Sequence, residues 1–153
     1  MNKKPEVIII GGGAAGFFAA INIAESNPQL KVTILEKSSK VLQKVKVSGG
    51  GRCNVTHACF DPKELIEYYP RGKKELLGPF HSFMTGDTIE WIEHRGIPLK
   101  IEDDMRMFPE SNSSQSIIDC FISSADKAGV QVLYNHNVNR IQKTDDHFLV
   151  ETK

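Results

Sequence analysis

The sequence predicts an α/β fold built on a parallel β-sheet, and three observations lead to this prediction. First, the short apolar run Val7–Ile10 is followed by three glycines and an alanine-rich stretch. Second, the β-branched run Lys31–Glu36 comes after that stretch, which is the β-α-β order typical of parallel sheets. Third, the amphipathic segment Ser113–Ala128 precedes another apolar run, Val130–Tyr134. Strands that alternate with helices favour one sheet with helices packed against it.

The first third of the chain holds the clearest local signals. Val7–Ile10 is apolar and β-branched throughout, which predicts a strand buried on both faces. Ala14–Ser26 combines alanines with large apolar residues on several sides, which predicts a helix buried over much of its circumference. Lys37–Thr56 is expected to be a loop, because Ser48–Gly51 contains three successive glycines.

The remaining elements are predicted from caps, periodicity and alternation. Asp61 followed by Pro62 predicts the start of a short helix that reaches about Tyr69. The further expected elements are helices over Thr85–Arg95 and Ser113–Ala128, short strands over Ile97–Ile101 and Arg106–Pro109, a core strand over Val130–Tyr134, and a hairpin of Asn137–Lys143 with His147–Thr152.

Composition and charge limit the class of protein. The chain has 153 residues, of which 40% are apolar, enough for one ordinary domain. Its 19 basic and 19 acidic residues balance, so the overall charge indicates no nucleic-acid and no membrane partner. The apolar run before Gly11 is too short for a signal peptide or a membrane span. Because Cys53, Cys59 and Cys120 lack a disulfide-scaffold spacing, we expect a cytoplasmic protein with free thiols.

The glycines after the first strand form a phosphate-binding motif. Residues 11–16, Gly-Gly-Gly-Ala-Ala-Gly, fit G-x-G-x-x-G at the junction of a strand and a helix. Gly11 permits the tight turn, Gly13 lets the backbone approach a pyrophosphate, and Gly16 lets the helix pack on the strand. The N–H groups of Ala14 and Ala15, at the start of the helix, are expected to face the phosphates.

An acidic residue completes this motif. Glu36 ends the second strand, where a carboxylate accepts hydrogen bonds from the ribose hydroxyls and repels a 2′-phosphate. FAD or NAD is therefore favoured over NADP. Together with the glycines, Glu36 predicts a Rossmann-like dinucleotide-binding domain.

The later segments carry a resemblance to a known family. VIIIGGGAAG, ILEK and KVSGGGRCNVTH, the last at Lys46–His57, resemble the BaiN-like family of NAD(P)/FAD-dependent oxidoreductases. This family includes aminoacetone oxidases and 3-dehydro-bile-acid reductases. Arg106–Pro109 resembles its G-R-x-F-P element, and VQVLYNHNVNRI resembles a strand that supplies adenine contacts. The resemblance implies a Rossmann-like FAD-binding domain of the glutathione-reductase type, with three layers and a C-terminal β-hairpin.

By this resemblance the cofactor is FAD. A guanidinium such as Arg52 can bind phosphate bidentately, and the amide of Asn54 can pair with the isoalloxazine edge. Lys44 is either an electrostatic contact or a solvated lysine, and many family members have Gly-Arg where Leu42-Gln43 stand here. The residues expected to contact FAD are Gly11, Gly13, Ala14, Ala15, Gly16, Glu36, Lys37, Lys44, Ser48, Gly49, Gly50, Gly51, Arg52, Cys53, Asn54 and, through its backbone, Val138.

Other reactive side chains carry weaker signals. Arg106 is a candidate for reaching the flavin or the substrate, although Met105 stands where the family has glycine. Cys53, His57 and Cys59 are residue types that bind zinc, but a fourth ligand with matching spacing is missing, so no metal is expected. The sequence identifies no catalytic residue.

Members of the resembled family are longer and continue into a substrate domain and a segment that closes over FAD. Residues 1–153 are therefore expected to be the N-terminal part of a FAD/NAD(P)-binding domain, truncated before those segments. Val7–Ile10 then becomes an exposed sheet edge through which the chain could form homo-oligomers.

The expected function is the FAD-binding portion of a flavoprotein oxidoreductase that transfers hydride to or from a small organic substrate. NAD(P)H is a candidate electron donor for the longer protein. Two alternatives are a catalytically silent nucleotide-binding fragment that needs a partner chain and an NAD-binding dehydrogenase domain.

Overall fold

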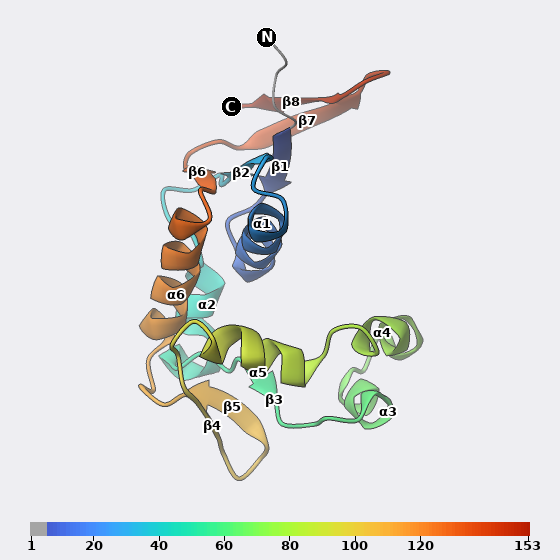
Figure 1. The fold of residues 1–153 in the computed structure, drawn as a ribbon, viewed down its shortest axis with the longest axis vertical. Coiled ribbons are helices and arrows are strands. Elements are labelled where there is room, and N and C mark those ends of the chain that lie inside the picture. The colour runs from blue at the N-terminus through green and yellow to red at the C-terminus, as the bar shows by residue number, and fades with distance from the viewer. Residues whose placement is uncertain (1–5) are drawn as a thin grey trace. The chain divides into compact units, whose positions relative to one another are not determined.

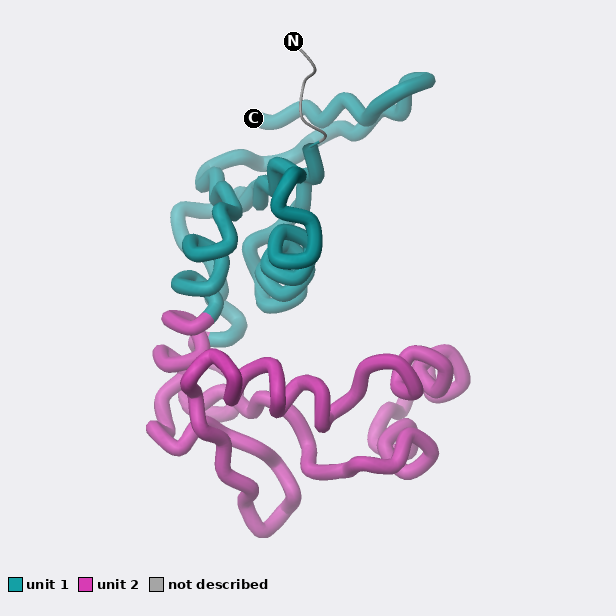
Figure 2. Tube along the Cα trace, in the orientation of Figure 1, with its two compact units in different colours: residues 1–45, 121–153 teal, residues 46–120 magenta. Residues whose placement is uncertain are grey.

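The computed structural model describes residues 6–153, which form two compact units (Figure 2). Unit 1 contains the described residues up to Val45 together with Phe121–Lys153, and unit 2 contains Lys46–Cys120. The chain therefore leaves unit 1 once and returns to it. Among residues 6–153, no helix combines the length and the hydrophobicity that crossing a membrane requires.

Unit 1 is built on a three-stranded parallel sheet in the order β1-β2-β6 (Figure 1). Its strands are β1 (Glu6–Ile10), β2 (Lys31–Leu35) and β6 (Gln131–Leu133). The central strand β2 is buried from Val32 to Leu35, whereas β1 lies at an edge of the sheet. This arrangement confirms the predicted parallel sheet and its third strand.

A helical layer and a hairpin cover the two faces of this sheet. Helix α1 (Ala14–Ser26) and the end of α6 (Ser114–Lys127) form the helical layer, where the rings of Phe17 and Phe121 meet edge to face at 6.2 Å. The antiparallel strands β7 (Val138–Lys143) and β8 (Phe148–Thr152) form the hairpin (Figure 1). The three layers and the hairpin are those that the sequence predicts.

The prediction that β1 is buried on both faces is wrong for one face. Ile9 faces α1, because its side chain lies 3.5 Å from the position of a Cβ atom at Gly16. The alternate residues Ile8 and Ile10 are 40% and 50% exposed and face the hairpin instead. They border an apolar hollow of about 300 Å³ with Ile141, Phe148 and Val150. The two-stranded hairpin covers only part of this face.

Unit 2 combines a small antiparallel sheet, in the order β3-β5-β4, with short helices. Asp61 caps its first helix, because Oδ1 accepts hydrogen bonds from the N–H groups of Lys63 (2.8 Å) and Glu64 (3.1 Å). The elements are the 3₁₀ turn η1 (Ser48–Gly51), β3 (Thr56–His57), α3 (Pro62–Leu65), η2 (Ile66–Tyr68), α4 (Lys73–Phe80), α5 (Thr85–Glu93), β4 (Leu99–Ile101) and β5 (Arg106–Pro109). Its buried side chains include Leu65, Ile92, Met107 and Phe108.

Helices α1, α5 and α6 begin and end within two residues of the predicted bounds, but helices α2 and α4 and strand β3 were not predicted. The stretch Lys37–Thr56 was expected to be a loop, yet it contains α2 (Gln43–Val47), which is too short to show a helical period. Helix α4 contains a glycine and Pro79, which lower its helix propensity. Strand β3 has two residues and forms only because β5 pairs with it.

Candidate functional site

The loop of residues 11–16 connects β1 to α1 and leaves the start of the helix uncapped. The N–H of Gly11 donates to the carbonyl of Leu35 at 2.8 Å, and the carbonyl of Gly13 accepts from the N–H of Phe17 at 3.0 Å. No side chain caps α1, and its first turn contains no acidic residue. The first N–H groups of a helix have no intrahelical partner, so this helix end can bind an anion.

Gly16 provides the close contact between α1 and this loop. A Cβ atom at position 16 would lie 2.0 Å from the carbonyl oxygen of Gly11. No side chain tolerates such a distance to backbone, so only glycine fits here. A Cβ atom at Gly13, in contrast, would meet nothing within 4 Å. Gly16 therefore has the packing role that the motif predicts.

Glu36 follows β2 and is held by three hydrogen bonds. Its Oε2 accepts from the N–H of Gly12, and its Oε1 accepts from the N–H and the hydroxyl of Ser38, each at 2.8 Å. Burial raises the pKa of Glu36, but these hydrogen bonds and the charge of Lys37 outweigh burial and hold the pKa below its ordinary value of 4.5. The side chain is a fixed carboxylate beside the glycine loop.

We predict that this carboxylate makes stability depend on pH. Because the pKa of Glu36 is lower in the folded than in the unfolded chain, its contribution is present above the ordinary value of 4.5 and is lost as the pH falls through the folded value. Glu36→Gln should therefore be less stable than the parent chain at about pH 7 and nearly as stable at about pH 3. Urea unfolding at both pH values measures the difference, and an equal difference at both would contradict the prediction.

A pocket of about 490 Å³ opens beside Gly12 and Glu36 within unit 1. It brings together five of the residues expected to contact FAD, and it adds Lys40 to Lys37 and Lys44. Three lysines around one carboxylate give the pocket a positive charge that suits a pyrophosphate. The lining residues are Gly12, Gly13, Ala14, Glu36, Lys37, Ser38, Lys40, Leu42, Gln43, Lys44 and Val45.

The other six lining residues were not among the expected FAD contacts, and two of them, Lys40 and Leu42, show what sequence reasoning missed. Leu42 is 2% exposed, and its N–H donates to the carbonyl of Gly12 at 2.8 Å. Its φ of 57° lies in the left-handed region that favours glycine. The glycine that many family members carry at this position was therefore the available signal. For Lys40 the sequence carried no signal beyond its position between Glu36 and Lys44.

The Ser48–Asn54 segment, which we call the SGGG loop, lies in unit 2 and forms a tight left-handed turn. Gly49, Gly50 and Gly51 have φ values of 54°, 68° and 86°, and the N–H of Cys53 closes the turn on the carbonyl of Ser48 at 3.0 Å. A Cβ atom at Gly49 would lie 2.7 Å from the backbone nitrogen of Asn54. Position 49 therefore requires glycine for two reasons: its φ is left-handed, and a side chain there would clash with the backbone of Asn54.

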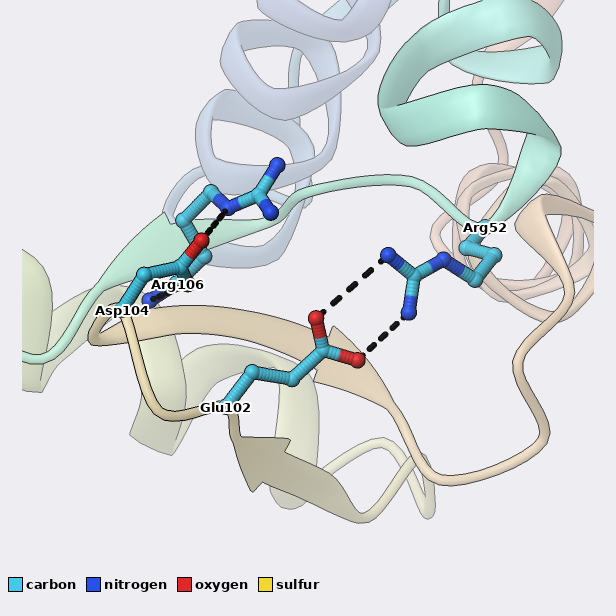
Figure 3. Close-up of polar contacts among 4 residues, drawn as sticks. All are labelled: Arg52, Glu102, Asp104 and Arg106. Atoms are coloured by element: carbon cyan, nitrogen blue, oxygen red, sulfur yellow. Dashed lines mark hydrogen bonds and ion pairs between the residues drawn. The ribbon is translucent and has the colours of Figure 1, made fainter.

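Arg52 is engaged by another part of unit 2. Its Nη1 lies 2.5 Å from Oε1 of Glu102 and its Nη2 lies 3.4 Å from Oε2, so the ion pair uses both prongs of the guanidinium (Figure 3). The guanidinium carbon also lies 4.0 Å from the ring centroid of Phe108. The expected phosphate contact of Arg52 stays a prediction, and it would compete with Glu102.

The next two residues of the SGGG loop also have partners inside unit 2. Burial raises the pKa of the Cys53 thiol, and a hydrogen bond with Ser48 offsets this only in part. The thiol is therefore protonated at neutral pH. The side-chain amide of Asn54 faces the carbonyls of Thr56 and Met107, and with its nitrogen turned toward them it donates to both, at 3.0 Å and 3.3 Å.

The remaining candidates lie on strands. Val138 begins β7 in unit 1, is half-buried and pairs with Thr152, so its backbone role toward adenine stays a prediction. Arg106 begins β5 in unit 2, and its Nε donates to Oδ2 of Asp104 at 2.6 Å. In the part of the chain that the structure describes, no three His, Cys, Asp or Glu side chains are grouped to hold a metal ion.

Comparison with known proteins places the chain in a family. Residues 5–153 match the family described as HI0933-like protein Rossmann domain. The chain belongs to this family. A 3-dehydro-bile acid delta(4,6)-reductase from Clostridium scindens is 27% identical over 142 residues. The family match and this relative together confirm the resemblance to BaiN-like flavoproteins.

A second relative of this HI0933-like domain has a different printed name. A protein called ribosomal RNA dihydrouridine synthase from Haemophilus influenzae is 29% identical over 143 residues, which cover 94% of this chain and 34% of that protein. The Clostridium match covers 93% of this chain and also 34% of the relative. The chain thus spans about a third of the length of these relatives.

Solved structures confirm the Rossmann-like FAD-binding fold of the HI0933-like domain. A flavocytochrome c3 fumarate reductase superposes with a TM-score of 0.66 at 20% identity, covering 95% of this chain and 29% of that one. A 3-ketosteroid-delta4-(5alpha)-dehydrogenase from Rhodococcus jostii RHA1 gives a TM-score of 0.64 at 16% identity, covering 99% and 45%. The chain is a Rossmann domain of a flavoprotein oxidoreductase family.

Proposed function

We propose that this chain holds FAD in an oxidoreductase that acts on a small organic substrate. One observation carries the proposal: Glu36, fixed by Gly12 and Ser38, borders a basic pocket at the uncapped start of α1. This arrangement fits a dinucleotide, because the helix end and the lysines suit the pyrophosphate and the carboxylate suits the ribose. The absence of a Cβ atom at Gly13 leaves room for phosphate oxygens.

We assign the following roles on this basis. Gly11, Gly13, Gly16 and the N–H groups of Ala14 and Ala15 form the pyrophosphate site, and Glu36 binds the ribose. Lys37, Lys40 and Lys44 balance the phosphate charge. The SGGG loop serves the flavin half, and the backbone of Val138 serves the adenine edge. Bound FAD would supply the hydride-transfer chemistry, and NAD(P)H is the proposed electron donor.

The substrate class is our own assignment. The two relatives are named for unlike substrates, a bile acid and ribosomal RNA. The chain has equal numbers of basic and acidic residues, which favours a small molecule over RNA.

A visible absorption spectrum of the purified chain, before and after addition of FAD, tests the proposal. We expect a flavin spectrum that shifts on binding and bleaches when NADH is added under nitrogen. A chain that stays colourless and binds only adenine nucleotides would instead be a silent nucleotide-binding domain, and one that binds only NAD would be a dehydrogenase domain. Reoxidation of the reduced flavin by an RNA fragment, but not by an unsaturated ketone, would overturn the small-molecule substrate.

We also predict that the chain associates with a second copy through β1. This strand pairs with β2 on one side only, and Ile8 and Ile10 on it are 40% and 50% exposed. Ile10→Lys should shift the chain to monomer in sedimentation velocity. Ile101→Lys, at an apolar residue of unit 2 that is 54% exposed, is the control and should leave association unchanged. A parent chain that is already monomeric would contradict the prediction.

A further inference from the structure

The SGGG loop needs contacts from other residues to stay ordered, because ordering its glycines costs much conformational entropy. Three successive glycines lose more conformational freedom on folding than any other residues. Yet Gly49, Gly50 and Gly51 adopt one defined left-handed path, with φ between 54° and 86°. Contacts from outside the loop must offset this entropy.

Those contacts come from the hairpin of β4 and β5, about 50 residues further along the chain. Glu102, in the turn of this hairpin, forms the two-pronged ion pair with Arg52. The side chains of Arg52 and Glu102 are only 35% and 27% exposed, so solvent screens this pair less than an open surface pair. The carboxylate thus fixes the residue that directly follows the glycines.

Phe108 supports the loop at two positions, Arg52 and Gly49. Its ring is fully buried, and the guanidinium of Arg52 stacks on it at 4.0 Å. Its Cε1 atom also lies 2.8 Å from where a Cβ atom of Gly49 would be. Just after the loop, the N–H of Val55 donates a hydrogen bond to the carbonyl of Met107, on the same strand as Phe108, at 2.8 Å. The loop is therefore held against β5 at Gly49 and Arg52, and the chain is bonded to β5 again at Val55.

We propose that Glu102 and Phe108 are positioning residues for the cofactor, and that they act by holding Arg52 and the SGGG loop in the shape that receives the flavin half of FAD. This inference rests on the proposed FAD-binding function. It assigns Arg52 to the support of the loop instead of to a phosphate.

A neighbouring ion pair provides a matched control. Asp104 and Arg106 lie in the same hairpin and are joined at 2.6 Å, but their side chains are 53% and 45% exposed (Figure 3). This pair links residues two positions apart, and the guanidinium carbon of Arg106 lies 5.4 Å from the centroid of the Phe108 ring, further than the 4.0 Å of Arg52. Asp104→Asn removes the same charge as Glu102→Gln but leaves the ion pair of Arg52 and the stacking of Arg52 on Phe108 in place.

The two roles of Arg52 predict opposite effects of Glu102→Gln. If Glu102 positions the loop, this variant should raise the exchange rate of the amide hydrogens in residues 49–54 about tenfold and weaken FAD binding about tenfold. If Arg52 is a phosphate ligand that Glu102 withholds, the variant should bind FAD more tightly. The charge-swapped double variant, Arg52→Glu with Glu102→Arg, should restore slow exchange and FAD affinity only in the positioning case.

The test uses the full 153-residue chain, with hydrogen exchange followed by mass spectrometry and FAD affinity followed by flavin fluorescence. Asp104→Asn should change both quantities less than twofold, about 0.4 kcal/mol. Unchanged loop exchange in Glu102→Gln, or tighter FAD binding, would overturn the inference. If the parent chain binds no FAD, the proposed function fails, whereas the comparison of exchange rates still decides whether Glu102 holds the loop.

Discussion

Replacement of Gly16 by alanine is expected to destabilise the chain strongly and to abolish cofactor binding. The added Cβ atom would lie 2.0 Å from the carbonyl oxygen of Gly11, so α1 would have to move away from the loop that it packs against. Overpacking of this kind costs about 3 kcal/mol, a large fraction of the stability of a small domain. For a chain of this size the melting temperature should fall by about 10 °C. Thermal unfolding followed by circular dichroism measures it.

Gly13→Ala is the matched control for this prediction. A Cβ atom at position 13 meets nothing within 4 Å, and the backbone φ of −90° is accessible to alanine. The variant should therefore unfold within about 1 kcal/mol of the parent chain. Because Gly13 lines the pocket, the methyl group should nevertheless weaken FAD binding. A stable Gly16→Ala variant, or an unfolded Gly13→Ala variant, would show that the two glycines do not divide their roles in this way.

Exchange of Glu36 for glutamine is expected to lower the affinity for adenine dinucleotides about tenfold or more. A hydrogen bond to a charged acceptor contributes about 1.5–3 kcal/mol, and each 1.4 kcal/mol changes a dissociation constant about tenfold. Loss of the negative charge also leaves Lys37, Lys40 and Lys44 unopposed in the pocket. The variant should therefore discriminate less against a ligand with a 2′-phosphate.

Calorimetric titration with ADP-ribose and with its 2′-phosphate measures both effects. The parent chain should prefer ADP-ribose, and Glu36→Gln should narrow or reverse this preference. Asp145→Asn, which removes an equal charge from an exposed turn of unit 1, should leave both affinities unchanged. Equal losses of affinity for the two ligands would mean that Glu36 supports the fold of the pocket and makes no contact that distinguishes a ribose hydroxyl from a 2′-phosphate.

Unit 1 was predictable because each of its elements carries a local signal. The apolar run of β1, the glycines of the loop and the alanines of α1 follow one another without interruption, and Glu36 stands directly after β2. Besides the short helix α2 and the pocket residues Lys40 and Leu42, the exposure of Ile8 and Ile10 was missed, because burial of a strand depends on what lies across its face. A short stretch of sequence does not indicate which residues will cover the face of a strand.

Unit 2 and the partners of its residues were less predictable, because they depend on contacts between distant positions. Strand β3 exists only through its pairing with β5. The SGGG loop stood out in the sequence, but nothing near Arg52 indicates that Glu102 pairs with it. For Leu42, only the family's glycine at this position indicated the left-handed backbone, and the hydrogen bond from its N–H to the carbonyl of Gly12 had no signal in the sequence.

The dependence of the SGGG loop on Glu102 and Phe108 has a consequence for synthesis of the chain. The two ends of the ion pair are separated by 50 positions. A ribosome adds about 5–20 residues per second, so the glycines emerge several seconds before the residues that hold them. During that interval the loop is open backbone without support, and a protease present at the ribosome should cut there. Once Phe108 has emerged and β5 has formed, the same site should become resistant.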